Sequence, residues 1–173
     1  MSDIKIQPSA TGSATLTLTA PVSNTARTIT LPDSTGTLST TSYAEGTFEV
    51  AMACTSGTIT LHSAIRTLAY VKIGKVVTIT GNLYASAVSS PSGALTITGL
   101  PFANGPGNHS RVAISVDWEE LNTSAATSLQ GSIMEGATVI KLSRFAAGVM
   151  TTMAGDIKVG SHIRIGGSYI AAT

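Results

Sequence analysis

The sequence predicts an all-β protein: a short N-terminal β-anchor followed by an antiparallel, jelly-roll-like β-sandwich. Short segments in which apolar and polar residues alternate recur along the chain, and Gly, Pro, Asn or Ser separates nearly all of them. Only 11% of the residues are charged, against about 25% in an average soluble domain, and Ser and Thr fill the polar positions. Since Thr is β-branched, it suits the solvent face of a strand. Helical stretches long enough to connect parallel strands are missing, which favours antiparallel order.

The N-terminal stretch holds two short strand patterns. Leu16 and Leu18 share one face of the first pattern, and Ile29 and Leu31 share one face of the second. Turn-forming residues, among them Pro21, lie between the two patterns. A β-element this small needs a partner to bury its single apolar face.

A boundary is expected near residues 39–46, where the sequence STTSYAEG is small, polar and unpatterned. It divides the chain into an N-terminal segment, residues 1–43, and a main domain, residues 44–173. Within the main domain the alternation predicts strands at 47–53, 57–61, 67–73, 76–84, 94–98, 111–118, 128–134, 138–142 and 162–165, with a further one at 168–171.

Two of these strands show which face points inward. The apolar face comprises Val77, Ile79 and Leu83 in one strand, and Val112, Ile114, Val116 and Trp118 in the other. Each such side chain contributes roughly 1.5 to 3 kcal/mol when it is buried, so these faces dominate the predicted stability of the domain. Trp118 belongs to this face, which favours core packing over display to a ligand.

Helical spacing occurs in one segment, where Phe145, Val149 and Met153 recur at every fourth position. Gly148 and the pair Thr151-Thr152 weaken a helix there. The segment is therefore expected to be either one short helix or a packed loop.

The charge and composition argue against several classes of protein. The net charge is +1 and the ten Lys and Arg residues are scattered, so no basic stripe for nucleic acid is present. The single cysteine, Cys54, lies in an apolar setting and is expected to be a small core residue. No apolar run reaches the ~20 residues of a membrane span, and residues 2–5 lack the features of a secretion signal. We expect no membrane insertion, and synthesis in a cytoplasm.

The sequence offers no catalytic or metal-binding constellation. His62, His109 and His162 are far apart, without a second ligand at metal-binding spacing. Glu119 and Glu120 are adjacent, and neighbours on a strand point to opposite faces, so they do not converge on one bond. Phosphate-binding loops and nucleophile elbows are also missing. We therefore expect no catalytic residues, no metal and no cofactor; a glycan-cleaving enzyme, the remaining enzymatic alternative, would depend on Glu119 or Glu120.

Three segments carry a resemblance to a known class of proteins. The run RTITLPDSTGTL at 27–38, preceded by AP-x-SNT at 20–25, resembles the N-terminal attachment motif of tailed-bacteriophage fibre and virion-decoration (head-fibre) proteins. YVKIGKVVTITGNL at 70–83 and GALTITGLPF at 93–102 resemble the C-terminal β-sandwich of such fibres. The resemblance implies a non-enzymatic, homotrimeric structural protein of a virion, assembled in the host cytoplasm.

On this reading residues 1–43 dock on other virion proteins, of the capsid or the tail, by adding short strands to neighbouring chains or by intertwining with them. The attachment residues are Leu16, Leu18, Ile29, Leu31 and Leu38. Two functions fit: a short head fibre or capsid decoration, or a tail-fibre tip that recognises a host surface glycan. The first is favoured because no shaft lies between anchor and sandwich.

The candidate receptor-facing surface is the loop from Phe102 to Ser110, with Asn104, Asn108 and His109 as hydrogen-bonding tips. Loops held on a rigid sandwich are common recognition sites, and side chains that both donate and accept suit sugar hydroxyls.

Overall fold

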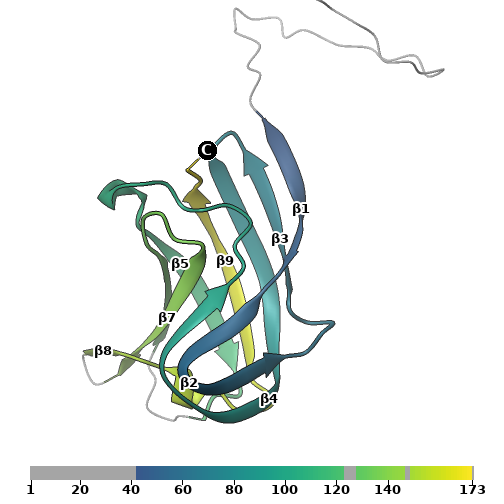
Figure 1. Cartoon of the computed structure of the whole chain (residues 1–173), viewed down its shortest axis with the longest axis vertical. Helices are drawn as coiled ribbons and strands as arrows, with labels where there is room; N and C mark the ends of the chain where they lie inside the picture. The colour runs from purple at the N-terminus through teal and green to yellow at the C-terminus, as the bar shows by residue number, and fades with distance from the viewer. Residues whose placement is uncertain (1–41, 123–127, 147–148, 173) are drawn as a thin grey trace, which may run out of the picture. The chain divides into compact units, whose positions relative to one another are not determined.

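The computed structural model describes residues 42–122, 128–146 and 149–172. The five apolar attachment residues, Leu16, Leu18, Ile29, Leu31 and Leu38, lie outside these ranges, so their role stays a prediction. Nine strands and two 3-10 turns follow one another along the described chain (Figure 1). They are β1 (Tyr43–Glu49), β2 (Ala51–Leu61), β3 (Thr67–Ile73), β4 (Val76–Thr98), η1 (Asn108–Ser110), β5 (Val112–Glu119), β6 (Ser128–Ile133), β7 (Val139–Ala146), β8 (Val149–Thr151), η2 (Ala154–Asp156) and β9 (His162–Ile170).

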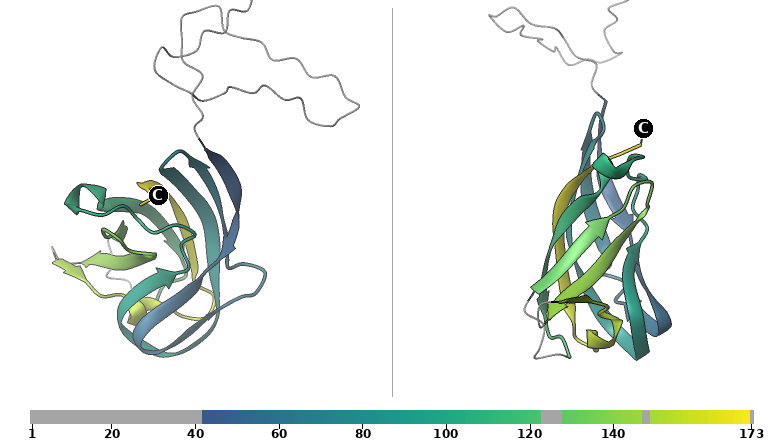
Figure 2. Two further views of the ribbon diagram at one scale, coloured as in Figure 1. Left: turned by 45° about the horizontal axis from the view of Figure 1, so that its top comes forward. Right: turned by 90° about the vertical axis from the view of Figure 1, so that its left-hand side faces the viewer.

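All pairings between these strands are antiparallel, which confirms the predicted all-β, antiparallel class. The first half of β4 pairs with β3 and β9, and its second half pairs with β2 and β7. In the same way β5 pairs with β6 at its start and with β9 at its end. Because β4 and β5 pass from one face to the other, the two faces of the predicted sandwich join into a closed barrel of β4, β9, β5, β6 and β7 (Figure 2). The remaining strands, β1, β2, β3 and β8, extend it.

β4 runs unbroken through the stretch where the sequence predicts two strands and a loop. Its bend is made by Ser90 at φ 41° and Gly93 at φ 79°, where the pairing with β2 shifts register. Opposite them Gly57 has φ 80°, and a Cβ on Gly57 would lie 2.3 Å from the carbonyl oxygen of Ser90. These irregularities act as β-bulges, which bend and twist a strand without ending it. β9 likewise joins two predicted strands across Gly166-Gly167.

The core confirms the predicted inward faces. Val77, Ile79, Leu83 and Ile114 are buried, whereas the intervening residues of β4 and β5 are more exposed. Val112, Val116 and Trp118 are partly buried and pack against the same core. Cys54 is a free thiol that also packs there, in a partly exposed position.

Two predictions of local structure are wrong. β1 begins at Tyr43, inside the expected linker, because its backbone pairs with β3 from Tyr43 opposite Ile73 onward. The segment predicted as a short helix or a loop instead contains β8, which pairs with the end of β7, Phe145 opposite Met150. The β-branched residues of β8 favour extended backbone. The apolar residues at every fourth position, Phe145, Val149 and Met153, therefore do not indicate a helix here.

Candidate functional site

Asn104 holds the predicted receptor-facing loop to the barrel. Its side chain is completely buried, and Nδ2 donates to the carbonyl oxygens of Ser110 at 2.6 Å and Met134 at 3.0 Å. Its backbone forms a bridge to Ala171. The prediction of Asn104 as a hydrogen-bonding tip is therefore wrong, because a buried amide that satisfies backbone carbonyls is unavailable to a ligand. In a Gly- and Pro-rich loop, the sequence does not distinguish a buried Asn that holds the loop in place from an exposed Asn that contacts a ligand.

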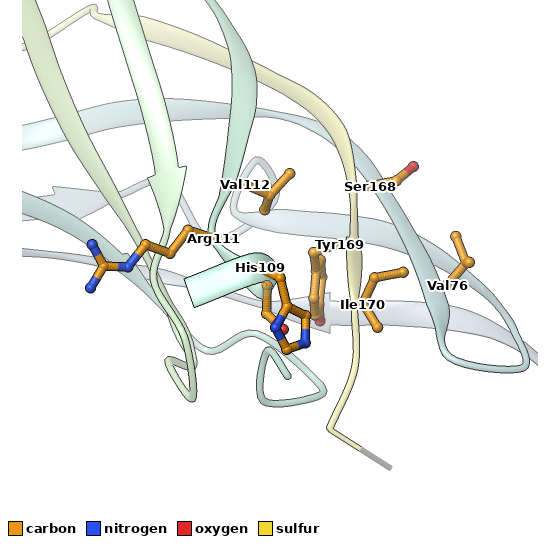
Figure 3. Close-up of a pocket in the computed structure, with 8 residues that line it drawn as sticks. Val76, His109, Arg111, Val112, Ser168, Tyr169 and Ile170 are labelled. Atoms are coloured by element: carbon orange, nitrogen blue, oxygen red, sulfur yellow. The ribbon is translucent and has the colours of Figure 1, made fainter. Parts of the chain in front are cut away.

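Asn108 and His109 are exposed and lie in η1, so the structure leaves both accessible; a role in recognition stays a prediction. His109 borders a pocket of about 150 Å³ between η1 and β9, shown in Figure 3. Tyr169 forms its floor and donates a hydrogen bond to the carbonyl oxygen of Phe102 at 2.9 Å. Burial raises the pKa of Tyr169 to about 12. Since Tyr169 is only 2% exposed, it cannot stack on a ligand, and the pocket is too small for a whole sugar ring to be enclosed.

A larger hollow lies on the outer face of the sheet, over three neighbouring strands. It has a volume of about 450 Å³ and is lined by residues of β4, β5 and β9. Strand register explains its composition: Thr80 lies opposite Gly166, which lies opposite Ser115, and in the next row Asn82 lies opposite Arg164, which lies opposite Asp117. We call this surface the β4–β9–β5 groove; it consists of Thr80, Gly81, Asn82, Ser115, Asp117, Arg164, Ile165 and Gly166.

Arg164 fixes one wall of the groove. Its Nη1 donates to Oδ2 of Asp117 at 2.8 Å, and its Nη2 donates to Oε1 of Glu119 at 2.7 Å. These bonds raise the pKa of the guanidinium, with that to Glu119 the largest cause. The neighbouring carboxylate, Glu120, bonds instead to Nζ of Lys158 at 2.8 Å, which lowers its pKa. The two adjacent acids, which the sequence expects to diverge, thus have different partners.

Rings cluster at the end of the same wall. Tyr84 lies between two histidines, with ring centroids 6.0 Å from His62 and 4.8 Å from His162. Nδ1 of His162 also lies 3.1 Å from Nδ2 of Asn82. Sequence reasoning treated the histidines as unrelated because they stand on separate elements, and only the pairing of β4 with β9 places Tyr84 opposite His162.

Within residues 42–122, 128–146 and 149–172, no three His, Cys, Asp or Glu side chains are placed to share a metal ion. Over the same residues, the structure contains no helix with the length and hydropathy needed to cross a bilayer.

Comparison with known proteins relates this fold to solved structures. No family model matches the sequence, and no curated protein matches it. Among solved structures, the chain is similar to the Dettilon tailspike protein (gp208), with 24% sequence identity and a TM-score of 0.67. The matched region covers 74% of this chain and 24% of that one, so this chain corresponds to a minor part of that protein's length. The likeness shows that a fold similar to the closed β-fold described above also occurs within this tailspike protein.

Proposed function

We propose that this chain is a non-enzymatic structural protein of a tailed-phage virion, of the fibre and tailspike type. The observation that carries the proposal is the shared fold with part of a tailspike protein. The attachment-like motif at residues 20–38 also supports it, because that motif precedes the barrel in the sequence and is a separate observation from the fold. In this role residues 1–43 fasten the chain to the particle and the barrel is the exposed module.

Exposed apolar residues support assembly of several copies, which the proposal takes to be three. Tyr43 lies opposite Ile73, Ile73 opposite Val76, and Val76 opposite Ile170, so four apolar residues form a row across β1, β3, β4 and β9. They are 61%, 56%, 45% and 45% exposed, respectively. Contiguous apolar patches of this kind mark contact surfaces between proteins. We call these four residues the apolar row.

A second copy of this chain is the occupant that the position of the apolar row favours. The row includes Tyr43, the first residue of β1, so it lies where the N-terminal segment joins the barrel. If N-terminal segments of several copies associate on a particle, these ends of the barrels are held at high effective concentration, and a modest apolar contact suffices.

The tail is the favoured position on the particle, because a solved protein that shares this fold is a tailspike. A capsid decoration or short head fibre is the second candidate. It is supported by the short distance in sequence between the attachment motif, which ends at Leu38, and β1, which leaves no room for a shaft.

Electron microscopy of particles carrying a tag at the C-terminus of the chain tests both positions. Label at the tail supports the fibre and tailspike role, label over the capsid supports decoration, and particles without label overturn the proposal. Deletion of residues 1–38, which removes all five attachment residues and leaves β1 and the apolar row intact, is expected to abolish association with the particle while the barrel still folds. Circular dichroism of the deleted chain provides the control for folding.

A further inference from the structure

We propose that the β4–β9–β5 groove binds a neutral saccharide of the bacterial surface, an inference that rests on the proposed virion role. It moves the candidate recognition surface from the loop at Asn108 and His109 to the outer face of three paired strands.

The groove exists because small residues stand side by side at its centre. Gly166 occupies an outward position of β9, and a Cβ built on it would meet nothing within 4 Å. Its neighbours in register, Thr80 and Ser115, are also small. On one side of this row Thr78 and Ser168 are linked through their hydroxyls at 2.8 Å, and on the other side stands the wall around Arg164. The hollow is open and shallow, which suits a sugar ring lying flat on the sheet.

The wall offers the bonding groups that hydroxyls require. A sugar hydroxyl both donates and accepts, so it pairs best where a carboxylate and a guanidinium lie together. Asp117 and Arg164 supply that combination, and their mutual ion pair holds both side chains in place before a ligand arrives.

The rings beyond the wall add an apolar contact. Tyr84 and His162 are partly exposed. They lie opposite each other and form the outward pair next to that of Asn82 and Arg164 on β4 and β9. The C–H face of a sugar packs on such rings, whose flat surface is apolar while their edges remain polar.

The charges favour a neutral saccharide. Two carboxylates, Asp117 and Glu119, share the single guanidinium of Arg164, so the wall carries a net negative charge. An acidic sugar would meet this charge without a further cation among the groove residues to balance it, so it should bind less tightly than a neutral one.

A protein partner fits the groove less well. Protein interfaces depend on exposed aromatic and aliphatic anchors. The one large aliphatic residue of the groove, Ile165, is buried in the core, and the exposed anchors of this face lie in the apolar row instead.

Binding is tested with the isotope-labelled full chain and a panel of neutral oligosaccharides of glucose, galactose, mannose, rhamnose and N-acetylglucosamine. Oligosaccharides that contain glucuronic or N-acetylneuraminic acid serve as the anionic comparison. We expect at least one neutral member to shift the amide resonances of Thr80, Ser115 and Gly166. A Cβ on Gly166 meets no atom within 4 Å, so Gly166→Tyr should place its ring in the hollow, lower affinity at least tenfold and keep the thermal midpoint. Thr47→Tyr places the same side chain at an outward position of β1, in the same row of the sheet but three strands away, and should leave affinity unchanged.

Three results overturn the inference: no neutral oligosaccharide bound at millimolar concentration, shifts confined to Asn108 and His109, or tighter binding of the anionic members. Each of them leaves the virion role standing if the tagged chain is found on particles. Absence of the chain from particles overturns the virion role instead, whatever the groove binds in isolation.

Discussion

Arg111 and Glu135 form a bidentate ion pair, with Nε 2.5 Å from Oε2 and Nη2 2.7 Å from Oε1. The pair connects the residue before β5 to the turn after β6, and both flank the loop that contains η1. These bonds lower the pKa of the Glu135 carboxyl to about 2, mainly through the hydrogen bond from Arg111.

Arg111→Gln is expected to return the pKa of Glu135 toward its ordinary value of 4.5. Because the folded-state pKa is lowered, the pair stabilises the fold above pH 4.5, and this contribution disappears as the pH falls toward 2. The urea midpoint of the wild type should therefore exceed that of the variant at pH 7 and equal it near pH 2. Carboxyl NMR titration gives the pKa directly. Lys141→Gln removes a positive charge from the neighbouring β7 and should leave the pKa of Glu135 low. If the pKa of Glu135 does not rise in Arg111→Gln, the hydrogen bond from Arg111 is not what lowers it.

Asn104→Ala should destabilise the barrel by about 1 to 3 kcal/mol, because the carbonyl oxygens of Ser110 and Met134 lose a buried donor. Asn108→Ala removes an exposed amide from the same loop and should change stability by no more than about 0.5 kcal/mol. Chemical denaturation of both variants measures the difference. If the two variants lose the same stability, the buried hydrogen bonds of Asn104 do not stabilise this end of the barrel.

Gly57→Ala should destabilise the barrel far more than Gly136→Ala does. Both glycines have positive φ, 80° and 65°, so both substitutions carry a backbone penalty of about 1 kcal/mol. Only at Gly57 does the new Cβ also collide with backbone, 2.3 Å from the carbonyl oxygen of Ser90, whereas nothing lies within 4 Å at Gly136. Thermal midpoints of the two variants compare the costs, and similar midpoints would show that the bend in β4 can relax.

Ile73→Lys should convert a trimer of the full chain into monomers, because it places a charge in the middle of the apolar row. Val159→Lys is the matched control, since Val159 is also 56% exposed but lies outside the row. Light scattering at micromolar concentration measures the mass of each. A wild-type monomer would count against association of the chain, and a trimeric Ile73→Lys would move the contact elsewhere.

Alternation along single strands was enough to predict the class of fold and most strands. In β5, for example, Ile114 and its apolar neighbours at every second position point inward as expected. The closure of the barrel could not be predicted, because it depends on bends at Ser90 and Gly93 that resemble ordinary turn residues in sequence.

The groove was missed for a related reason. Gly166, Arg164 and Asp117 are unremarkable by themselves, and their grouping comes from the register of β9 against β4 and β5. Register across strands that are distant in sequence follows from packing of the whole barrel, which a single sequence does not specify. Of the three loop residues that the sequence predicts as hydrogen-bonding tips, Asn104 is buried and structural, while Asn108 and His109 are accessible and their role in recognition stays a prediction.

The continuity of β4 through both halves of the barrel has a mechanical consequence. β4 pairs with β9 through its first half and with β7 through its second half. Because both halves of the barrel share this strand, unfolding one half disrupts the pairing of the other, and a partly unfolded state should be scarcely populated. Amide exchange in β4 is therefore expected to be slow along both arms, and both arms should lose their protection in a single step.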